Sequence, residues 1–239
     1  MSNRNFIFDV DGTLTPSRAK IVEEFRVWFT DFFINNDVYL VTGSDYPKTE
    51  EQLGEYLLRW PVTVYNCSGN DVWQKGVNIR TNPWTMPVVV QEFLQYRLDT
   101  SKFVLRTGQH FDIRPGSVNF SILGRGATLQ ERQLYRAWDS ETSERNQLIE
   151  DFRRNFGDEL EISAGGETGV DIYPRGCNKS QILTDFDKET DFILFFGDRM
   201  DEHGNDRPLA DRLFADGYQG ATYPVEDWQH TWRILKDLT

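Results

Sequence analysis

Two aspartates lie two residues apart near the start of the chain, in the segment FIFDVDGTLT that spans residues 6–15. Residues two apart along an extended backbone point to the same side, so Asp9 and Asp11 can face one site. A carboxylate can attack phosphorus and form a reactive aspartyl phosphate. A second carboxyl group nearby can carry protons to and from the oxygens involved. The pair therefore predicts phosphoryl-transfer chemistry.

The same pair of aspartates has two other interpretations, a backbone-binding turn and a calcium loop. Both aspartates would also suit a turn in which their side chains only accept hydrogen bonds from the backbone. An EF-hand calcium loop is excluded, because Thr13 occupies the third ligand position and Leu14 stands where that loop requires glycine.

A strand must present the two aspartates. Phe6, Ile7 and Phe8 are large and apolar without polar alternation, which is typical of a strand buried on both faces of a parallel sheet. The run ends at Asp9, and open α/β folds bind their ligands at this carboxyl edge of the sheet. We therefore expect Asp9 and Asp11 to lie in the ligand site.

Strand and helix patterns alternate in the rest of the first third of the chain. We expect a helix over 21–33, a strand over 38–41, a helix over 49–60 and a strand over 62–65. Another fully apolar run over 191–196 and shorter segments after it resume this pattern near the end of the chain. The predicted fold class is α/β, with a doubly wound parallel, Rossmann-like sheet as the core.

The intervening residues have a different pattern, and we interpret them as an inserted α+β cap domain. Helices are expected over 88–98, 129–138 and 143–156, and strands over 103–106, 111–114, 118–123, 160–163 and 170–173. Turn residues such as Pro115-Gly116 between strand patterns indicate antiparallel pairing. The expected domains are a core of residues 1–79 and 175–239 and a cap of residues 80–174.

Three of the predicted core strands end in polar residues, namely Asp9, Thr42 and Asp198. The ends of parallel strands meet at one edge of a sheet, so these residues can converge. Clustered carboxylates repel one another unless a cation neutralises them. An all-oxygen site beside a phosphate suits Mg²⁺, which is the cofactor we expect.

The D-x-D-G-T-L-T segment resembles the haloacid-dehalogenase superfamily of phosphotransferases. This resemblance implies that Mg²⁺ is held by the Asp9 carboxylate, the backbone carbonyl of Asp11 and Asp198. It also implies that a further acidic residue, Asp206, and a lysine, Lys179, belong to the catalytic site. Either Thr42 or Ser44 would donate a hydroxyl hydrogen bond to the phosphoryl group.

The expected cap resembles a narrower family, the eukaryotic-type phosphomannomutases. The resemblance lies in residues 112–125, in Gln130-Glu131-Arg132 and in residues 165–174. It implies that Arg18 of the core contacts the sugar phosphate. In the cap, it implies that Arg114, Arg125 and Arg132 contact the sugar phosphate and that Asp171 binds sugar hydroxyls.

The chain departs from that family at four places, one of which is a shorter region before Phe103. Gly169 stands where the family has a serine that contacts phosphate, so one donor in this substrate-binding position is missing. Cys177 replaces a large aromatic residue, and residues 66–70 replace an acidic-Asn-Gly turn. These departures bear on the substrate and on mutase efficiency rather than on the fold.

Composition narrows the partners. A net charge of −12 argues against nucleic acids and anionic membranes as partners. The family resemblance implies a small-molecule sugar phosphate as the partner. The two cysteines lack the spacing of a zinc site or a disulfide framework. No charged-then-apolar leader follows Met1 and no apolar run approaches about 18 residues, so a cytoplasmic setting is expected. Trp84 and Trp138 lie in the cap, where they would either pack in its core or form a homodimer contact.

Together these features predict a phosphohexomutase of the phosphomannomutase type, with mannose as the expected hexose. A magnesium-dependent sugar-phosphate phosphatase would use the same core and let water finish the reaction. A non-catalytic sensor of sugar phosphates is the third candidate, and it is disfavoured because each expected catalytic residue is present.

Overall fold

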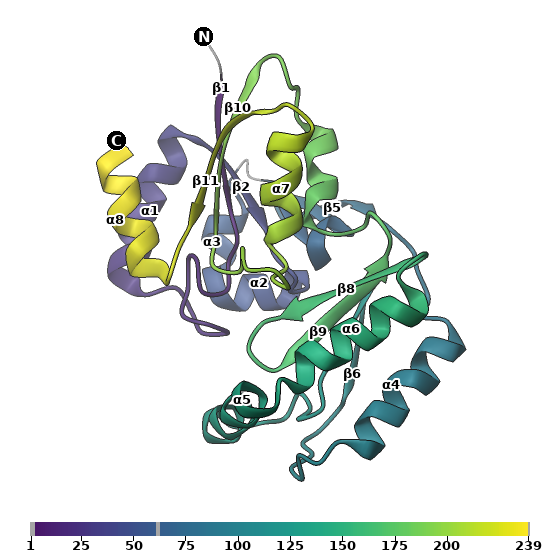
Figure 1. Ribbon diagram of the computed structural model, residues 1–239. Helices are drawn as coiled ribbons and strands as arrows, with labels where there is room; N and C mark the ends of the chain where they lie inside the picture. The colour runs from purple at the N-terminus through teal and green to yellow at the C-terminus, as the bar shows by residue number, and fades with distance from the viewer. Residues whose placement is uncertain (1–2, 61–62, 239) are drawn as a thin grey trace. The chain divides into compact units, whose positions relative to one another are not determined.

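A computed structural model of the chain describes residues 3–60 and 63–238 (Figure 1). The chain divides into two compact units, Met1–Thr81 with Asn178–Thr239 and Asn82–Cys177. The expected boundaries were residues 79 and 174. Each unit has its own sheet and its own apolar core.

Unit 1 is built on a seven-stranded sheet with the order β11-β10-β1-β2-β3-β4-β5. The first five strands pair in parallel and the last two are antiparallel additions. The strands are β1 (Asn3–Phe8), β2 (Asp37–Val41), β3 (Thr63–Asn66), β4 (Asp71–Gln74), β5 (Val77–Thr81), β10 (Asp191–Gly197) and β11 (Gln219–Pro224). The predicted α/β class with a largely parallel sheet is confirmed. Val62, the predicted start of the third strand, lies outside the described residues.

Helices cover both faces of this sheet, as the unbroken apolar strands require. Phe6 and Phe8 face one side of β1, where α1 (Glu23–Asn35) and α8 (Trp228–Leu238) lie next to each other. Ile7 faces the other side, together with residues of η2 (Lys179–Asp185) and α7 (Arg207–Ala215). Because Phe6, Ile7 and Phe8 are at most 2% exposed, each side chain contributes about 1.5–3 kcal/mol of burial free energy.

The segment predicted as one helix over 49–60 is two helices, α2 (Tyr46–Leu53) and α3 (Glu55–Leu58). Asp45 caps α2, since its side chain accepts a hydrogen bond from the Lys48 amide at 3.1 Å. Gly54 separates the helices with a φ of +83°, a conformation that favours glycine. Lys179 begins a 3₁₀ helix, η2 (Lys179–Asp185).

The antiparallel hairpin of β4 and β5 was not predicted. Its two-residue turn, Lys75-Gly76, has φ values of +53° and +75°, which is the left-handed geometry that hairpins favour. The sequence signal for this turn is the glycine of the Lys75-Gly76 pair, which lies between Gln74 and Val77.

Unit 2 is an antiparallel sheet with helices packed on one face. The strand order is β6-β7-β9-β8, with β6 (Phe111–Arg114), β7 (Ser117–Phe120), β8 (Leu160–Gly165) and β9 (Gly169–Pro174). The helices are α4 (Val88–Thr100), α5 (Leu129–Thr142) and α6 (Glu144–Phe156). Phe120, Ile162, Val170 and Ile172 point into the apolar core, while the alternate residues on the same strands are polar.

One strand predicted in unit 2 is wrong. Residues 101–110 form an irregular loop instead of a strand over 103–106. The Arg106 guanidinium donates to the carbonyl oxygens of Leu98 and Phe103 and so holds the loop against the end of α4. Phe103 packs on Tyr135, whereas Val104 is 86% exposed. The inward–outward alternation therefore mimics a strand without ladder pairing.

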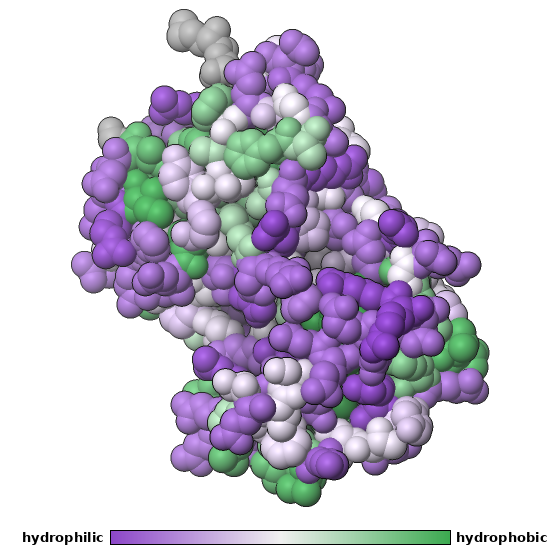
Figure 2. Space-filling view, in the orientation of Figure 1, coloured by the Kyte–Doolittle hydropathy of each residue, from purple (hydrophilic) through white to green (hydrophobic). Residues whose placement is uncertain are grey.

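The surface agrees with the composition. The face seen in Figure 2 is mostly hydrophilic, as 27% charged residues predict. Trp84 and Trp138 are both partly buried against the core of unit 2. No helix in the described part of the chain is long and apolar enough to span a membrane.

Candidate active site

Three aspartates meet at the carboxyl edge of the unit 1 sheet. Asp9 follows β1 and Asp198 follows β10, and the register pairs Phe8 with Phe196, so the two aspartates leave adjacent strands with an offset of one residue. The Asp9 amide continues the ladder by donating to the Phe196 carbonyl at 2.9 Å. Asp206 precedes α7, and one carboxylate oxygen from each of the three lies within 4.8 Å of the others.

Lys179 lies between two of these carboxylates. Its Nζ donates to Asp9 Oδ1 at 2.6 Å and to Asp206 Oδ1 at 2.7 Å, and the lysine is completely buried. Asn178, just before it, caps η2 by accepting a hydrogen bond from the Ser180 amide at 2.9 Å. Burial alone would lower the pKa of Lys179, but the Asp206 and Asp9 carboxylates more than offset this and hold that pKa above its ordinary value. Lys179 is therefore a fixed positive charge.

One lysine does not balance three carboxylates. Burial raises the pKa of Asp9 well above its ordinary value, against the opposing charge of Lys179 and together with the repulsion of Asp206 and Asp198. Burial and the Asp206 charge also raise the pKa of Asp198 to about 7. The excess negative charge and the all-oxygen donor set fit a divalent cation.

The backbone beside these aspartates leaves room for them. A Cβ built on Gly12 would lie 2.5 Å from Asp198 Oδ2, and one built on Gly197 would lie 2.6 Å from Asp206 Oδ2. Gly12 also has a φ of +83°. Glycine at position 12 therefore serves both the turn after Asp11 and the close approach of Asp198.

The Asp11 carboxylate takes no part in this cluster. Its Oδ1 accepts from the Arg18 amide at 2.6 Å and from Gln52 Nε2 at 3.0 Å, and its Oδ2 accepts from Ser44 Oγ at 3.3 Å. These donors fix the orientation of the Asp11 carboxylate. Gln52, a buried residue of α2, was not predicted, because nothing in its local sequence distinguishes it from other residues of an amphipathic helix.

Thr42 and Ser44 occupy the loop after β2. Thr42 is buried, and its hydroxyl oxygen accepts a hydrogen bond from the Ser44 amide at 3.1 Å. Ser44 uses its own hydroxyl to contact Asp11. Another hydroxyl, that of Thr13, lies 3.4 Å from Asp9 Oδ2 and was not predicted as a site residue.

The loop that departs from the family pattern supports Thr42 and Ser44. The Cys67 amide donates to the Ser44 carbonyl at 2.9 Å, and the Ser68 amide donates to the Thr42 carbonyl at 2.8 Å. Cys67 and Ser68 both have left-handed φ values, +49° and +60°, which non-glycine residues adopt at a cost of about 1–2 kcal/mol each. Both residues that donate backbone bonds to the β2 loop are thus in the left-handed conformation.

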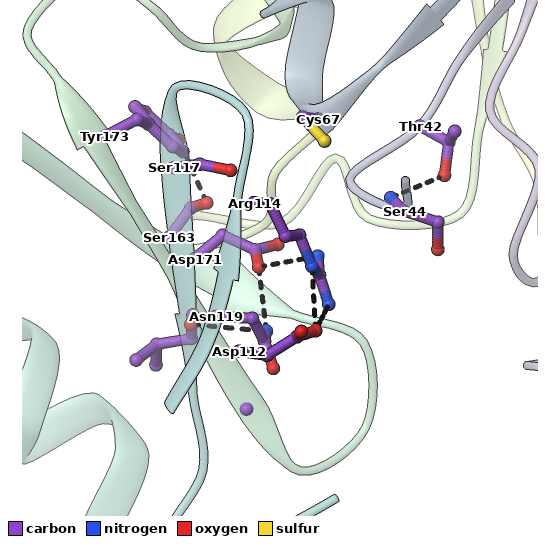
Figure 3. A network of polar contacts seen from close by, with 12 residues as sticks. Thr42, Ser44, Cys67, Asp112, Arg114, Ser117, Asn119, Ser163, Asp171 and Tyr173 are labelled. Carbon is purple, nitrogen blue, oxygen red and sulfur yellow. Dashed lines mark hydrogen bonds and ion pairs between the residues drawn. The ribbon is translucent and has the colours of Figure 1, made fainter. Parts of the chain in front are cut away.

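In unit 2, the predicted sugar-binding residues Arg114 and Asp171 lie on the polar face of the sheet (Figure 3). Arg114 donates to Asp112 Oδ2 through Nε at 2.9 Å and to Asp171 Oδ1 through its NH1 nitrogen at 3.5 Å. Asn119 donates to Asp171 Oδ1 at 2.7 Å. Arg125 contacts Asp112 Oδ2 at 2.9 Å and Asn119 Oδ1 at 3.2 Å.

The remaining predicted residues are Arg132, Gly169 and Arg18. Arg132 is buried on α5 and donates to the Thr168 hydroxyl at 3.4 Å. Gly169, which begins β9, adjoins the Asn119 amide. Arg18 belongs to unit 1, where its amide holds Asp11 and its carbonyl accepts from Lys48 Nζ at 3.1 Å.

Sequence comparisons give one consistent result. The eukaryotic phosphomannomutase family profile matches residues 29–239. A phosphomannomutase of Galdieria sulphuraria is 33% identical over 210 residues, covering 84% of this chain and 82% of that protein. A probable phosphomannomutase of Caenorhabditis elegans is 28% identical over 249 residues, covering 97% and 95%. Human phosphomannomutase 1 is 30% identical over 221 residues, covering 88% and 82%.

Solved structures similar to this chain share its fold. An IMP-bound IMP-nucleotidase of Plasmodium falciparum aligns with a TM-score of 0.64 at 15% identity, covering 99% of this chain and 68% of that one. The C-terminal domain of trehalose-6-phosphate phosphatase from C. albicans aligns with a TM-score of 0.63 at 16% identity, covering 95% and 80%. A haloacid dehalogenase-like hydrolase of Bacteroides thetaiotaomicron aligns with a TM-score of 0.59 at 11% identity, covering 99% and 100%.

Proposed function

Because this chain belongs to the eukaryotic phosphomannomutase family, we propose that it interconverts hexose 6-phosphate and hexose 1-phosphate through a phosphorylated Asp9. The observation that carries this proposal is the cluster of Asp9, Asp198 and Asp206 with Lys179 at the carboxyl edge of the sheet. The cluster offers an oxygen nucleophile, a fixed positive charge and an oxygen-lined cation site within one small volume.

Asp9 is the nucleophile in this proposal. In its phosphorylated form, Asp9 passes the phosphoryl group to the free hydroxyl of a bound hexose phosphate: the new bond joins the sugar oxygen to phosphorus, the bond from phosphorus to the Asp9 oxygen breaks, and Asp11 takes the hydroxyl proton. The hexose bisphosphate formed then turns over in the site, the Asp9 carboxylate attacks its other phosphate, and Asp11 gives the proton to the departing sugar oxygen. The contacts of Asp11 with Arg18, Gln52 and Ser44 support a separate role for this carboxylate, because they hold it outside the acidic cluster.

The other core residues stabilise the transferred group. Lys179 supplies a compact positive charge, and the Thr42 or Ser44 hydroxyl donates a hydrogen bond to a phosphoryl oxygen. Mg²⁺ bound by Asp9, Asp198 and the Asp11 carbonyl, with Asp206 in support, would neutralise charge on the phosphoryl oxygens.

Residues of unit 2 bind the part of the sugar phosphate that is not reacting. We assign the second phosphate to Arg114, Arg125 and Arg132, since guanidinium groups match phosphate oxygens in pairs. Asp171 accepts hydrogen bonds from sugar hydroxyls. Arg18 in unit 1 completes the set. Unit 2 is thus proposed as the substrate-specificity cap.

One observation favours a second candidate, a sugar-phosphate phosphatase. Gly169 offers no hydroxyl to a phosphate, so the site for the non-reacting phosphate has fewer donors than the family pattern. Weaker binding of that phosphate would give water more time to attack the aspartyl phosphate. The two candidates share the chemistry of Asp9 and differ only in which oxygen receives the phosphoryl group.

The test is one reaction with two products. The protein is incubated with mannose 1-phosphate, Mg²⁺ and a trace of hexose bisphosphate, and hexose 6-phosphate and free phosphate are both measured. Hexose 6-phosphate as the main product supports the mutase. Free phosphate as the main product makes the protein a phosphatase, and neither product at any enzyme concentration would leave only a sensor.

Location and assembly remain part of the proposal. We propose a reducing, cytoplasmic setting, because the two cysteines of the sequence do not have the number and spacing of a disulfide framework. A homodimer through unit 2 is proposed from its exposed apolar residues, among them Val104 and Ile113, and sedimentation of the wild-type protein tests it.

A further inference from the structure

Five polar side chains of unit 2 form a closed ring, of which Figure 3 labels Asp112, Arg114, Asn119 and Asp171. Arg114 joins Asp112 to Asp171, and Arg125 joins Asp112 to Asn119. Asn119 closes the ring by donating to Asp171 at 2.7 Å. The sheet register explains the ring, because it pairs Asp112 with Asn119 across β6 and β7 and pairs Asn119 with Asp171 across β7 and β9.

Asn119 is the neutral member of this ring, and it uses both ends of its amide. The NH₂ group donates to the carboxylate of Asp171, and the carbonyl oxygen accepts from the guanidinium of Arg125. The side chain is 4% exposed. A buried amide with both ends in charge-assisted bonds has a fixed orientation, and it fixes the two charged groups relative to each other.

A pair of glycines makes room for the ring. Gly165 and Gly169 are register partners at the end of the β8–β9 hairpin. A Cβ on Gly165 would lie 2.5 Å from Asp171 Oδ2, and one on Gly169 would lie 3.0 Å from Asn119 Nδ2 and 3.1 Å from its Oδ1. Neither glycine has a positive φ. These positions therefore require the space that glycine leaves, and not its conformational freedom.

We propose that Asn119 is a positioning residue of the sugar-phosphate site and that Gly169 is tied to it. The inference rests on the proposed function, in which Arg125 binds phosphate and Asp171 binds sugar hydroxyls. Asn119 holds these two groups at the separation and angle that one hexose phosphate requires. A side chain at position 169 acts on binding by displacing the Asn119 amide.

The physical expectation is a loss of substrate binding rather than of chemistry at Asp9. Without Asn119, the Asp171 carboxylate loses its shortest hydrogen bond in the ring, and Arg125 keeps only Asp112 among the ring contacts described above. Both groups are then held by fewer contacts than in the wild-type protein. For Asn119→Ala we expect the KM for mannose 1-phosphate to rise at least about tenfold, equal to about 1.4 kcal/mol, with the loss concentrated in KM.

The control is Val118→Ala. Val118 is the adjacent residue of β7 and is 1% exposed, and its side chain points to the opposite face of the sheet. This substitution costs folding stability without touching the ring. Its KM should stay within about twofold of the wild-type value when the two proteins are compared at equal folded fraction. The folded fraction is measured by thermal unfolding. Asn119→Asp, which keeps the size of the side chain and removes the donor to Asp171, gives the same comparison if Asn119→Ala does not fold.

A double-mutant cycle tests the link to Gly169. Gly169→Ala should raise KM in the wild-type background, because the new Cβ crowds the Asn119 amide. In the Asn119→Ala background two of the three close contacts are gone, and only the Phe120 carbonyl at 3.1 Å remains. The second substitution should then change KM by less than about half as much in logarithmic terms.

Two results would overturn the inference. One is a KM for Asn119→Ala that equals that of Val118→Ala, and the other is full additivity with Gly169→Ala. The proposed function is judged separately, by the products of the wild-type protein. If that protein releases only free phosphate, KM for the hydrolysis of mannose 1-phosphate replaces the mutase KM. If it turns over neither way, calorimetric binding of mannose 6-phosphate is compared among the same variants, and no binding to wild type overturns both proposals.

Discussion

Replacing Lys179 by methionine would remove the only cation within hydrogen-bonding distance of Asp9 and Asp206 among the described contacts. Methionine nearly keeps the volume, so the change is mainly electrostatic. The side chains of Lys179 and Asp206 are both 0% exposed, so neither water nor salt screens the interaction between them. Removing one partner of such a buried pair costs about 3–5 kcal/mol, because the other charge stays buried and uncompensated.

We expect Lys179→Met to lower the free energy of unfolding by about 3–5 kcal/mol in a chelator. Mg²⁺ should restore part of that loss, since a bound cation compensates the same carboxylates and stabilises the folded state by mass action. Phosphoryl transfer should be lost in both conditions, as the cation does not replace the lysine at the phosphoryl group. The assay is urea unfolding with and without Mg²⁺, alongside the reaction with mannose 1-phosphate.

Lys188→Met is the matched control. Lys188 is an exposed lysine of the same unit, whose Nζ donates to the Asp216 carbonyl at 2.8 Å and lies 5.1 Å from the Tyr218 ring centre. This variant should lose less than about 1 kcal/mol. A loss for Lys179→Met no larger than that of the control would refute the reasoning about the buried charges. A loss that Mg²⁺ deepens would show that Lys179 and the cation are not complementary.

Four further outcomes are expected. Asp9→Asn should fold normally and lose activity, and retention of more than about a tenth of the wild-type rate would contradict its role as nucleophile. Asp11→Asn should slow turnover by ~10²–10⁴ through lost proton transfer while Mg²⁺ binding measured by calorimetry persists; loss of Mg²⁺ binding would mean that the carboxylate is itself a ligand. A chelator should stop the reaction and Mg²⁺ but not Ca²⁺ should restore it, because Ca²⁺ takes more ligands at longer distances; full activity in chelator would remove the metal from the mechanism. Arg125→Ala and Arg132→Ala should each lower the ratio of phosphate migration to hydrolysis of a small phosphate ester by at least about tenfold, and an unchanged ratio would favour the phosphatase.

The chemistry at the edge of the sheet could be predicted from the sequence because its signals are local. Phe6, Ile7 and Phe8 indicate a strand buried on both faces, and a strand of that kind has a carboxyl end where Asp9 must lie. The same argument applies to Asp198 after β10. The apolar pattern of a strand and the direction of the chain can both be read from neighbouring residues, so they can be predicted before the fold is known. The family resemblance added the assignments of Lys179 and Asp206.

The local pattern also led to a wrong strand prediction, at a segment whose backbone has no neighbouring strand to pair with in the described part of the chain. Residues 103–106 alternate inward and outward like a strand, but ladder pairing depends on what lies alongside, and here the Arg106 guanidinium binds the nearby carbonyls instead. The β4–β5 hairpin was missed although its Lys75-Gly76 turn was visible.

The tertiary structure alone decided which polar atoms meet. Lys179 and Asp9 are 170 residues apart in sequence and 2.6 Å apart in space, and Gln52 reaches Asp11 from a helix 41 residues away. Asn119 acquires its place in the ring from strand register, which sets it beside Asp112 and Asp171. A residue type states which bonds a side chain can make, whereas the partner within about 3 Å is set by long-range packing.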